Sequence, residues 1–226
     1  MTRHRVVIDQ ERRVAGARPE PAPNAPVFFL SYSRAGRLAP RVQAFHQKLS
    51  EHIAELMAVP AGCEPGFIDR ELVAGQVWAE ELAFALGHCQ VFVPLLSAPY
   101  LQSKWCAREW NAFARRTVRP LVDGAHRGTS VIPVVWNVLR HDAEVPDAVS
   151  RVQLFIPSGP PPDVASAYRA EGMYGLPLIG DPGRGLFDAA VWRLAQQIVQ
   201  AAHERWIEPD VPADLESLST EFGEAS

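Results

Sequence analysis

A regular alternation between short apolar runs and longer amphipathic stretches constrains the fold of this chain more than any other feature. The apolar runs predict buried strands, and the stretches with an apolar residue every three or four positions predict helices. The predicted strands lie at residues 27–32, 66–69, 91–96, 131–136 and 152–156. The predicted helices lie at residues 38–57, 77–88 and 187–203, with a further one beginning at residue 104. This alternation predicts an α/β fold, in which a parallel sheet carries helices on both faces.

The order of the strands follows from the handedness of their connections. Right-handed crossovers favour a flavodoxin-like, five-stranded parallel sheet in the order 2-1-3-4-5. Pro94 and Pro133 stand within two of the predicted strands and argue against full pairing there, because proline cannot donate to the ladder. Ligands of such sheets bind at the carboxyl ends of the strands, where the order reverses. We therefore expect a crevice between the first and third strands.

The helix that begins at Lys104 carries two neighbouring stripes of side chains. Ser103 is a good N-cap for it, and Cys106, Trp110 and Phe113 are spaced four and three apart, as a core-facing stripe requires. Two further residues, Trp105 and Glu109, are one turn apart on the adjacent stripe. A tryptophan and a carboxylate are thus predicted to stand together beside the core, just after the carboxyl end of a strand.

A second polar group follows the first strand. Tyr32, Ser33 and Arg34 come directly after its apolar run, and Asp69 ends the second predicted strand. In the order 2-1-3-4-5 these residues and the Trp105 helix meet at the same edge of the sheet. The two signals together predict a candidate site at the crevice.

The chain divides into a central domain and two segments without apolar periodicity. Residues 1–26 are rich in Arg, Pro and Ala and are expected to be a flexible tail. Residues 208–226 contain six acidic residues and neither Lys nor Arg, so they are expected to form an acidic tail. Both tails are predicted to be dispensable for folding of the domain at 27–207. Within that domain, residues 161–207 form an extension that ends in the last helix.

Several residues outside the candidate site have simpler expected roles. His46 and His52 lie off the apolar stripe of the first helix and are expected at the surface. Arg115, Arg116 and Arg119 are expected to complement the carbonyl end of the Lys104 helix. The Gly/Pro-rich residues 172–185 are expected to be irregular, with a turn at 180–185.

Composition narrows the class of protein. A net charge of −4 and a pI near 6 favour no nucleic-acid partner. Three cysteines without a CxxC pair, and no apolar run long enough for a signal peptide or a membrane span, predict a reduced, cytoplasmic protein with no membrane contact. No metal-ligand spacing is present, and neither a metal nor a cofactor is expected.

The chain resembles the bacterial form of the TIR (Toll/interleukin receptor) domain over about residues 27–160. The matching stretches are FFLSYSR at 28–34, FIDRELVAGQVWAEELAFALGHC at 67–89, VFVPLLSAPYLQSKWCAREW at 91–110 and VIPVVW at 131–136. It is most similar to actinobacterial TIR-like proteins encoded beside FxSxx-carboxylate peptide clusters, in which PGF-x-DR and WC-x-REW strings recur. The resemblance makes residues 27–207 a TIR-like domain with a role in signalling or defence.

The resemblance implies two alternative activities. Many bacterial TIR domains are NAD+ glycohydrolases with a catalytic glutamate in a W-x-x-x-E motif, which corresponds here to Trp105 and Glu109. Other TIR domains only assemble with one another or with an effector protein. This chain has Ala35-Gly36 where relatives often have Asp, and Ala74-Gly75 where they often have Pro-Gly.

One carboxylate is chemically sufficient for the first activity. Nicotinamide leaves the cationic ring as a neutral base, and positive oxocarbenium charge develops on the ribose, which an ionised Glu109 would stabilise. Trp105 would provide a flat wall for the pyridinium ring. Near it, Tyr32, Ser33 and Arg34 would hold ribose or phosphate oxygens, and Asp69 a ribose hydroxyl. NAD+ is then a substrate and not a cofactor.

Self-association would complete this site. A shallow crevice at a sheet edge is expected to leave the carboxylate wet, which weakens its electrostatic effect. The loop at residues 70–76 is the candidate cover, and it would reach the site of a neighbouring subunit in a head-to-tail contact. Its assembly residues are predicted to be Arg70, Glu71 and Gly75.

A purely structural interpretation of the same residues stays open. Glu109 would then pair with Arg34 or Arg108 at the surface, Trp105 would belong to the core, and Ser31 and Asp69 would cap loops. A phospho-receiver is excluded because the strand ends lack its acids, and Cys106 lacks a base that would make it a nucleophile. The sequence leaves an NAD+-cleaving enzyme and a TIR–TIR interaction module as the two alternatives.

Overall fold

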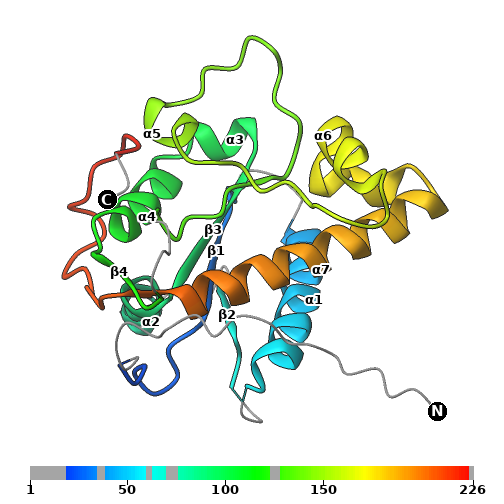
Figure 1. Ribbon diagram of the computed structural model, residues 1–226. Coiled ribbons are helices and arrows are strands. Elements are labelled where there is room, and N and C mark those ends of the chain that lie inside the picture. Colours follow the sequence, from blue (N-terminus) through cyan, green and yellow to red (C-terminus); the bar gives the residue numbers. More distant parts are fainter. Residues whose placement is uncertain (1–18, 35–38, 60–62, 70–75, 123–127, 224–226) are drawn as a thin grey trace, which may run out of the picture.

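A computed structural model describes most of this 226-residue chain. The described residues are 19–34, 39–59, 63–69, 76–122 and 128–223, and the side chains of 39 and 76–79 are excluded. The predicted assembly residues Arg70, Glu71 and Gly75 lie outside this set. Within the described part, the fold is a parallel sheet between two layers of helices (Figure 1).

The central sheet confirms the predicted order of the first four strands. Its strands run parallel in the order β2-β1-β3-β5, and their bounds are Phe28–Ser31 for β1, Gly66–Ile68 for β2, Val91–Leu96 for β3 and Val134–Val135 for β5. Side chains of β1 and β3 are buried on both faces, as expected of strands with near-continuous apolar runs. Residues that follow β1 and β3 line a common cavity at the carboxyl ends of these strands, where the crevice was expected.

The two strand prolines have different consequences. Pro94 pairs with Ser31 at the last rung between β3 and β1, so the missing N–H removes little of that ladder. Pro133 interrupts the predicted strand at 131–136. Val131 makes only an isolated bridge to Phe92, and regular pairing resumes at β5.

The predicted fifth strand at 152–156 does not form. This segment contains no strand, and the contact of its backbone with the neighbouring segment is a hydrogen bond from Phe155 N to Pro133 O, at 2.8 Å. Phe155 is buried, whereas Leu154 and Ile156 on either side are exposed. The segment therefore alternates like a strand without joining the sheet, because the short, proline-interrupted β5 offers few groups to pair with.

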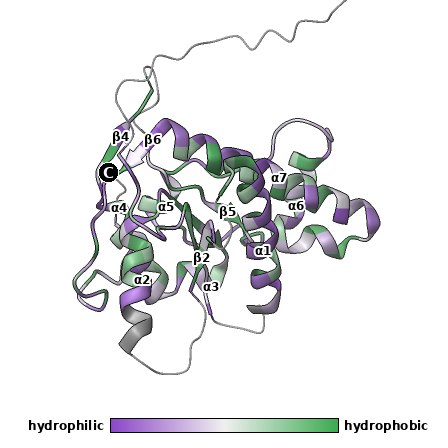
Figure 2. Ribbon diagram, turned by 90° about the horizontal axis from the view of Figure 1, so that it is seen from below, coloured by the Kyte–Doolittle hydropathy of each residue, from purple (hydrophilic) through white to green (hydrophobic). Residues whose placement is uncertain are grey.

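Helices cover the two faces of the sheet as two separate layers. Figure 2 shows β2 and β5 between α2 and α4 on one side and α1 and α6 on the other. One core cluster packs under the layer of α1 (Ala39–Met57), α6 (Val164–Gly175) and α7 (Asp181–Glu204). The other packs under α2 (Gln76–His88) and α4 (Lys104–Ala114). Three short helices lie in the connections between these elements: α3 (Ala98–Leu101), α5 (Asp147–Ser150) and η1 (Leu176–Leu178).

The predicted core faces of the helices are confirmed wherever their side chains are described. Buried positions of α1 are Val42, Phe45, Leu49 and Ile53, and those of α4 are Cys106, Trp110 and Phe113. The expectation for His46 was wrong, because this residue is 2% exposed with its ring 5.5 Å from that of Phe28. His52 is half-buried and lies edge-on to Trp192.

The extension after residue 160 is more helical than predicted. The expected irregular region at 172–185 contains the end of α6, the 3-10 helix η1 and the first turn of α7. Gly172 breaks the helical path with φ 67°, and its α-carbon lies so near Trp136 O that a β-carbon would be 2.7 Å from it. The expected turn at 180–185 instead begins a helix, since Pro182 is well suited to a first helical turn.

A second, two-stranded sheet joins distant parts of the chain. β4 (Val118–Pro120) pairs antiparallel with β6 (Arg205–Ile207), which continues from α7. The nearby Arg116 is 1% exposed and does not simply complement a helix end. Its guanidinium donates to four carbonyl oxygens, at 2.7–3.2 Å, from Leu86, Cys89, Ile207 and Glu208.

The described part of the acidic C-terminal segment packs against α4. Trp110 donates through Nε1 to Gly223 O at 2.8 Å, and Asn111 donates through Nδ2 to Ser219 O and Glu221 O at 3.0 and 2.7 Å. The ring of Phe222 lies 5.9 Å from that of Trp110. Residues 208–223 thus form part of the folded body, which their composition did not predict.

None of the helices in the described ranges is long and apolar enough to cross a lipid bilayer.

Candidate functional site

The site is assembled where β1, β2 and β3 end. Ser103 caps α4 by accepting a hydrogen bond from Cys106 N at 3.2 Å, as predicted. This cap fixes the start of α4, and Glu109 lies on a buried face of the helix, toward the end of β1. There Ser31 donates through its hydroxyl to Glu109 Oε2, at 2.5 Å.

Glu109 is buried and not paired at the surface. Glu109 is 1% exposed, so the alternative interpretation, in which it pairs with Arg34 or Arg108 at the surface, is excluded. Burial raises the pKa of Glu109 to about 8, and the nearby negative charge of Asp69 adds to this effect. Hydrogen bonds from Ser31 and Trp105 and the positive charge of Arg34 oppose it. The expectation that this carboxylate is wet was therefore wrong for the described structure.

Asp69 connects the other predicted site residues. It is 3% exposed and accepts a hydrogen bond from Trp105 Nε1 at 3.3 Å. It also forms an ion pair with the partly exposed Arg34. Three strand ends and α4 thus bring together the residues that the sequence singled out, and the contacts of Asp69 fix the orientation of the Trp105 ring.

A cavity of about 700 Å³ opens beside these contacts. Its walls contain four predicted residues, Tyr32, Ser33, Arg34 and Trp105, and three that were not predicted, Pro99, Gln102 and Ser103. The unpredicted residues belong to the turn after β3, which sequence spacing places near the crevice but does not orient. Asp69 and Glu109 are buried and are not among the described residues that line the cavity, and Trp105, which does line it, contacts Asp69.

A larger cavity, of about 1250 Å³, lies at the opposite end of the sheet. Its walls are residues that precede the strands, including Val27, Pro65 and Gln90, together with residues of α2. None of the predicted site residues lines it. We place the candidate site at the cavity of about 700 Å³, because the predicted polar residues meet there, at the carboxyl ends of the parallel strands.

Sequence reasoning missed one buried tyrosine. Tyr100, in α3, is fully buried with its hydroxyl 3.2 Å from Ser31 Oγ. Its backbone N–H donates to Ser97 Oγ at 3.3 Å, which fixes the start of α3. The sequence offers no periodic signal for Tyr100, since α3 is a single turn in a loop that contains Pro99.

This arrangement can stabilise positive charge. A buried carboxylate stands behind an aromatic wall, and an arginine at the rim can meet an anionic group of a ligand. Across the described ranges, no group of three or more His, Cys, Asp or Glu side chains is placed to hold a metal ion.

Comparison with known proteins supports the resemblance seen in the sequence. A family profile described as the TIR domain matches residues 28–159, which is more than half of the chain. No curated protein matches the sequence significantly. The finer resemblance, to actinobacterial proteins encoded beside FxSxx-carboxylate peptide clusters, stays a prediction. The parallel β2-β1-β3-β5 sheet between helical layers has the flavodoxin-like form of this family. The chain belongs to the TIR-domain family.

Proposed function

We propose that this protein hydrolyses the bond between nicotinamide and ribose in NAD+, with Glu109 as the catalytic carboxylate. The TIR family includes members with this activity. The observation that carries the proposal is the placement of Glu109, buried at the end of β1 beside a cavity lined by Tyr32, Ser33 and Arg34. A carboxylate kept from water at the carboxyl edge of a parallel sheet acts strongly on any positive charge that develops beside it.

The reaction needs charge stabilisation more than proton transfer to the leaving group. The C1′–N bond breaks with its electron pair passing to the nicotinamide nitrogen, so a neutral base departs from a cation. Oxocarbenium charge develops on the ribose, and the ionised Glu109 stabilises it more in the transition state than in the ground state. Water then adds to C1′ and releases a proton, which gives ADP-ribose when the product is not cyclised.

The described geometry defines what substrate binding has to change. Glu109 is not among the described residues that line the cavity, whereas Trp105 lines it and is hydrogen-bonded to Asp69 and to Glu109. The Trp105 ring must leave this position for the ribose to meet the carboxylate. In the proposed complex the ring then stacks on nicotinamide, Arg34 turns a guanidinium edge to a phosphate, and Asp69 accepts from a ribose hydroxyl.

The direct test is incubation of purified protein with NAD+ and chromatographic detection of nicotinamide and ADP-ribose. We expect both products, or nicotinamide with a cyclised product, in amounts that grow with time and protein concentration. Complete retention of NAD+ by folded protein, both dilute and concentrated, would remove the enzymatic proposal.

An assembly module is the alternative function. TIR domains generally associate through TIR–TIR contacts, and here the exposed Leu154 and Ile156 lie beyond β5 on an extended segment that the sheet does not use. Apolar side chains in such a place favour contact with a second TIR domain or an effector protein. Leu154→Glu should then lower the mass that light scattering measures for concentrated protein, whereas an unchanged mass would argue against assembly through this edge.

A further inference from the structure

Three buried polar side chains, those of Ser31, Tyr100 and Glu109, are linked by hydrogen bonds in the protein core next to the site. Ser31 and Tyr100 are fully buried and Glu109 is 1% exposed. The Ser31 hydroxyl is 2.5 Å from Glu109 Oε2 and 3.2 Å from the Tyr100 hydroxyl. The three residues come from β1, α3 and α4, so these hydrogen bonds connect three separate elements at one point.

The direction of these hydrogen bonds follows from the number of hydrogens available. A serine hydroxyl has one hydrogen, and Ser31 donates it to Glu109 when that carboxyl is ionised, because a carboxylate can only accept. The contact between Ser31 and Tyr100 then requires Tyr100 to be the donor. Two hydrogen bonds in series thus lead to the ionised carboxylate, from the Tyr100 hydroxyl to Ser31 and from the Ser31 hydroxyl to Glu109.

We propose that Ser31 is the positioning residue of the Glu109 carboxylate, and that Tyr100 orients the Ser31 hydroxyl toward it. The pair holds the carboxylate oxygen at the end of β1 and favours its charged form. The importance of this pair for turnover rests on the proposed function, but its effect on the charge of Glu109 does not.

Other charged and titratable groups also face Glu109, with opposing effects. Asp69, at the end of β2, disfavours a negative charge there, and Arg34 after β1 favours it. The indole N–H of Trp105 also favours the charged form. Burial and the charge of Glu109 raise the pKa of Cys106 on α4, so this thiol stays neutral beside the carboxylate. Arg34 and Trp105 line the cavity, whereas Ser31 and Tyr100 are buried and are not among the described residues that line it. The Ser31–Tyr100 pair therefore acts on Glu109 from the core and not from the side on which a ligand would bind.

Tyr100 is supported from behind by the C-terminal segment. The Phe222 ring lies 5.8 Å from the Tyr100 ring, and Gly223 next to it accepts a hydrogen bond from Trp110. These two residues lie beyond residue 159, where the TIR-domain match ends. The chain thus completes the packing behind its own site with a segment that the family match does not include.

The test measures the charge of Glu109 without measuring activity. The folded protein keeps Glu109 neutral to a higher pH than the unfolded chain does, so parent protein loses stability relative to Glu109→Gln as pH rises above the ordinary value of a carboxyl. This loss levels off at the pKa of Glu109 in the folded protein. Denaturant unfolding of both proteins across pH 5–10, about the range these values require, locates that levelling point.

Ser31→Ala, compared with the double variant Ser31→Ala/Glu109→Gln, should move the levelling point upward by about one pH unit or more, since it removes a hydrogen bond to a charged group. Tyr100→Phe, compared with the double variant Tyr100→Phe/Glu109→Gln, should move the levelling point in the same direction by less.

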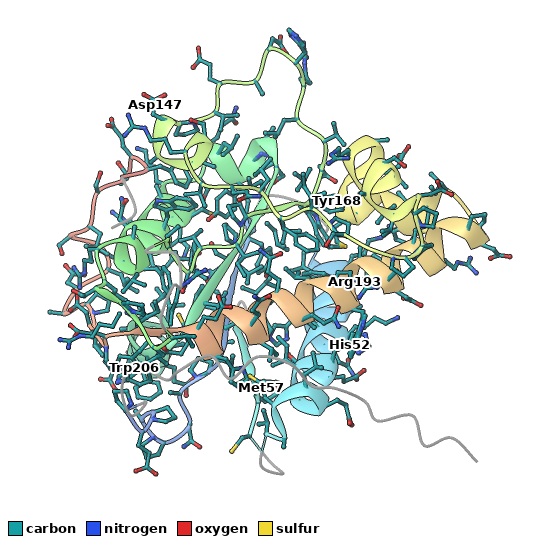
Figure 3. All side chains as sticks on the ribbon, in the orientation of Figure 1. His52, Met57, Asp147, Tyr168, Arg193 and Trp206 are labelled. Carbon is teal, nitrogen blue, oxygen red and sulfur yellow. The ribbon has the colours of Figure 1, made fainter. Side chains whose placement is uncertain are left out.

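Each of the two variants has a matched control. Ser130→Ala removes a fully buried hydroxyl, and Tyr168→Phe removes the hydroxyl that accepts from Val135 N. Tyr168 packs in the core cluster of α6 and α7, away from α4 (Figure 3). Neither control should move the levelling point.

The proposal is overturned if Ser31→Ala leaves the levelling point where parent protein has it, or if Ser130→Ala moves it equally. Tyr100→Phe removes one oxygen without changing the ring, and it decides the question by itself should Ser31→Ala not fold. If parent protein releases no nicotinamide, the proposed function fails while the titration result still stands. If it does release nicotinamide, the pH at which kcat/KM rises should shift together with the levelling point in Ser31→Ala and in Tyr100→Phe.

Discussion

The indole nitrogen of Trp105 lies 3.3 Å from Asp69 Oδ2, and both residues act on the buried Glu109. Asp69 thereby has two roles in the described state. It tethers the aromatic wall of the cavity, and its charge faces the carboxylate behind that wall. In this arrangement the side chain of Glu109 is kept from water and is largely neutral near pH 7, because burial raises its pKa to about 8.

The first prediction concerns the pH dependence of turnover. Burial raises the pKa of Glu109 to about 8, and only its ionised form stabilises a developing cation. The value of kcat/KM should therefore rise about tenfold per pH unit below that pKa and level off above it. Steady-state kinetics between about pH 6 and 9.5 checks this expectation. A profile that is flat over this range would mean that Glu109 does not have to ionise for catalysis.

Asp69→Asn should shift this profile in the opposite direction to Ser31→Ala. The amide keeps the size of the side chain and can still accept from Trp105, but it removes the negative charge that faces Glu109. The pKa of Glu109 should fall, and the rise in kcat/KM should move to lower pH. The pH midpoint, and not the rate itself, is the informative quantity, because Asp69 is also a proposed substrate contact. A midpoint that moves upward would show that Asp69 does not oppose the charge on Glu109.

The order of the fold was readable from the sequence because it depends on local patterns. The apolar run at 91–96 and the Ser103 cap act through their immediate neighbours, so β3 and α4 begin where they were predicted to begin. The strand predicted at 152–156 failed for a non-local reason. Its alternation is suited to a strand, but the partner strand is cut short by Pro133.

The residues of the candidate site were predictable from two local signals. Tyr32, Ser33, Arg34 and Asp69 were singled out as polar residues at strand ends, and Trp105 and Glu109 by their spacing on the Lys104 helix. The structure brings the two groups together. Buried polar residues were misjudged, because polarity predicts exposure and does not reveal a distant partner. Such residues are His46, which stands against Phe28; Arg116, which binds four carbonyl groups; and Tyr100, which contacts Ser31.

A stability prediction follows for the core stripe of α4. Phe113 is 2% exposed, and its ring stacks on that of Phe92 with 5.4 Å between centroids. Phe113→Ala should lower the free energy of unfolding by about 3–5 kcal/mol through lost burial and a cavity. Chemical denaturation measures it, with the exposed Val138→Ala as the control, which should change stability by less than about 0.5 kcal/mol. A loss below about 1 kcal/mol for Phe113→Ala would contradict the assigned packing.

The C-terminal segment should matter for folding, which revises the expectation drawn from its composition. Asn111 binds the backbone of this segment at three places, and Leu215 and Phe222 pack on the core cluster of α2 and α4. Removal of residues 208–226 should therefore lower the melting temperature.

Phe222→Ala in the full chain should lower the melting temperature in the same direction as the truncation, because it removes the ring that lies against Tyr100 and Trp110. The exposed Glu221→Ala is its matched control, since only the backbone of that residue is used. An unchanged melting temperature on removal of 208–226 would show that the packing of this segment contributes nothing to stability.

The most direct test of the central claim compares nicotinamide release from NAD+ by parent protein, Glu109→Gln and Glu81→Gln. The last variant makes the same chemical change at an exposed position of α2. Assayed near pH 8.5, about where Glu109 is ionised, Glu109→Gln should lose activity by about 100-fold or more while melting no earlier than parent protein. Glu81→Gln should match parent protein in rate. Parent-level release of nicotinamide by folded Glu109→Gln would contradict the assignment of Glu109 as the catalytic carboxylate.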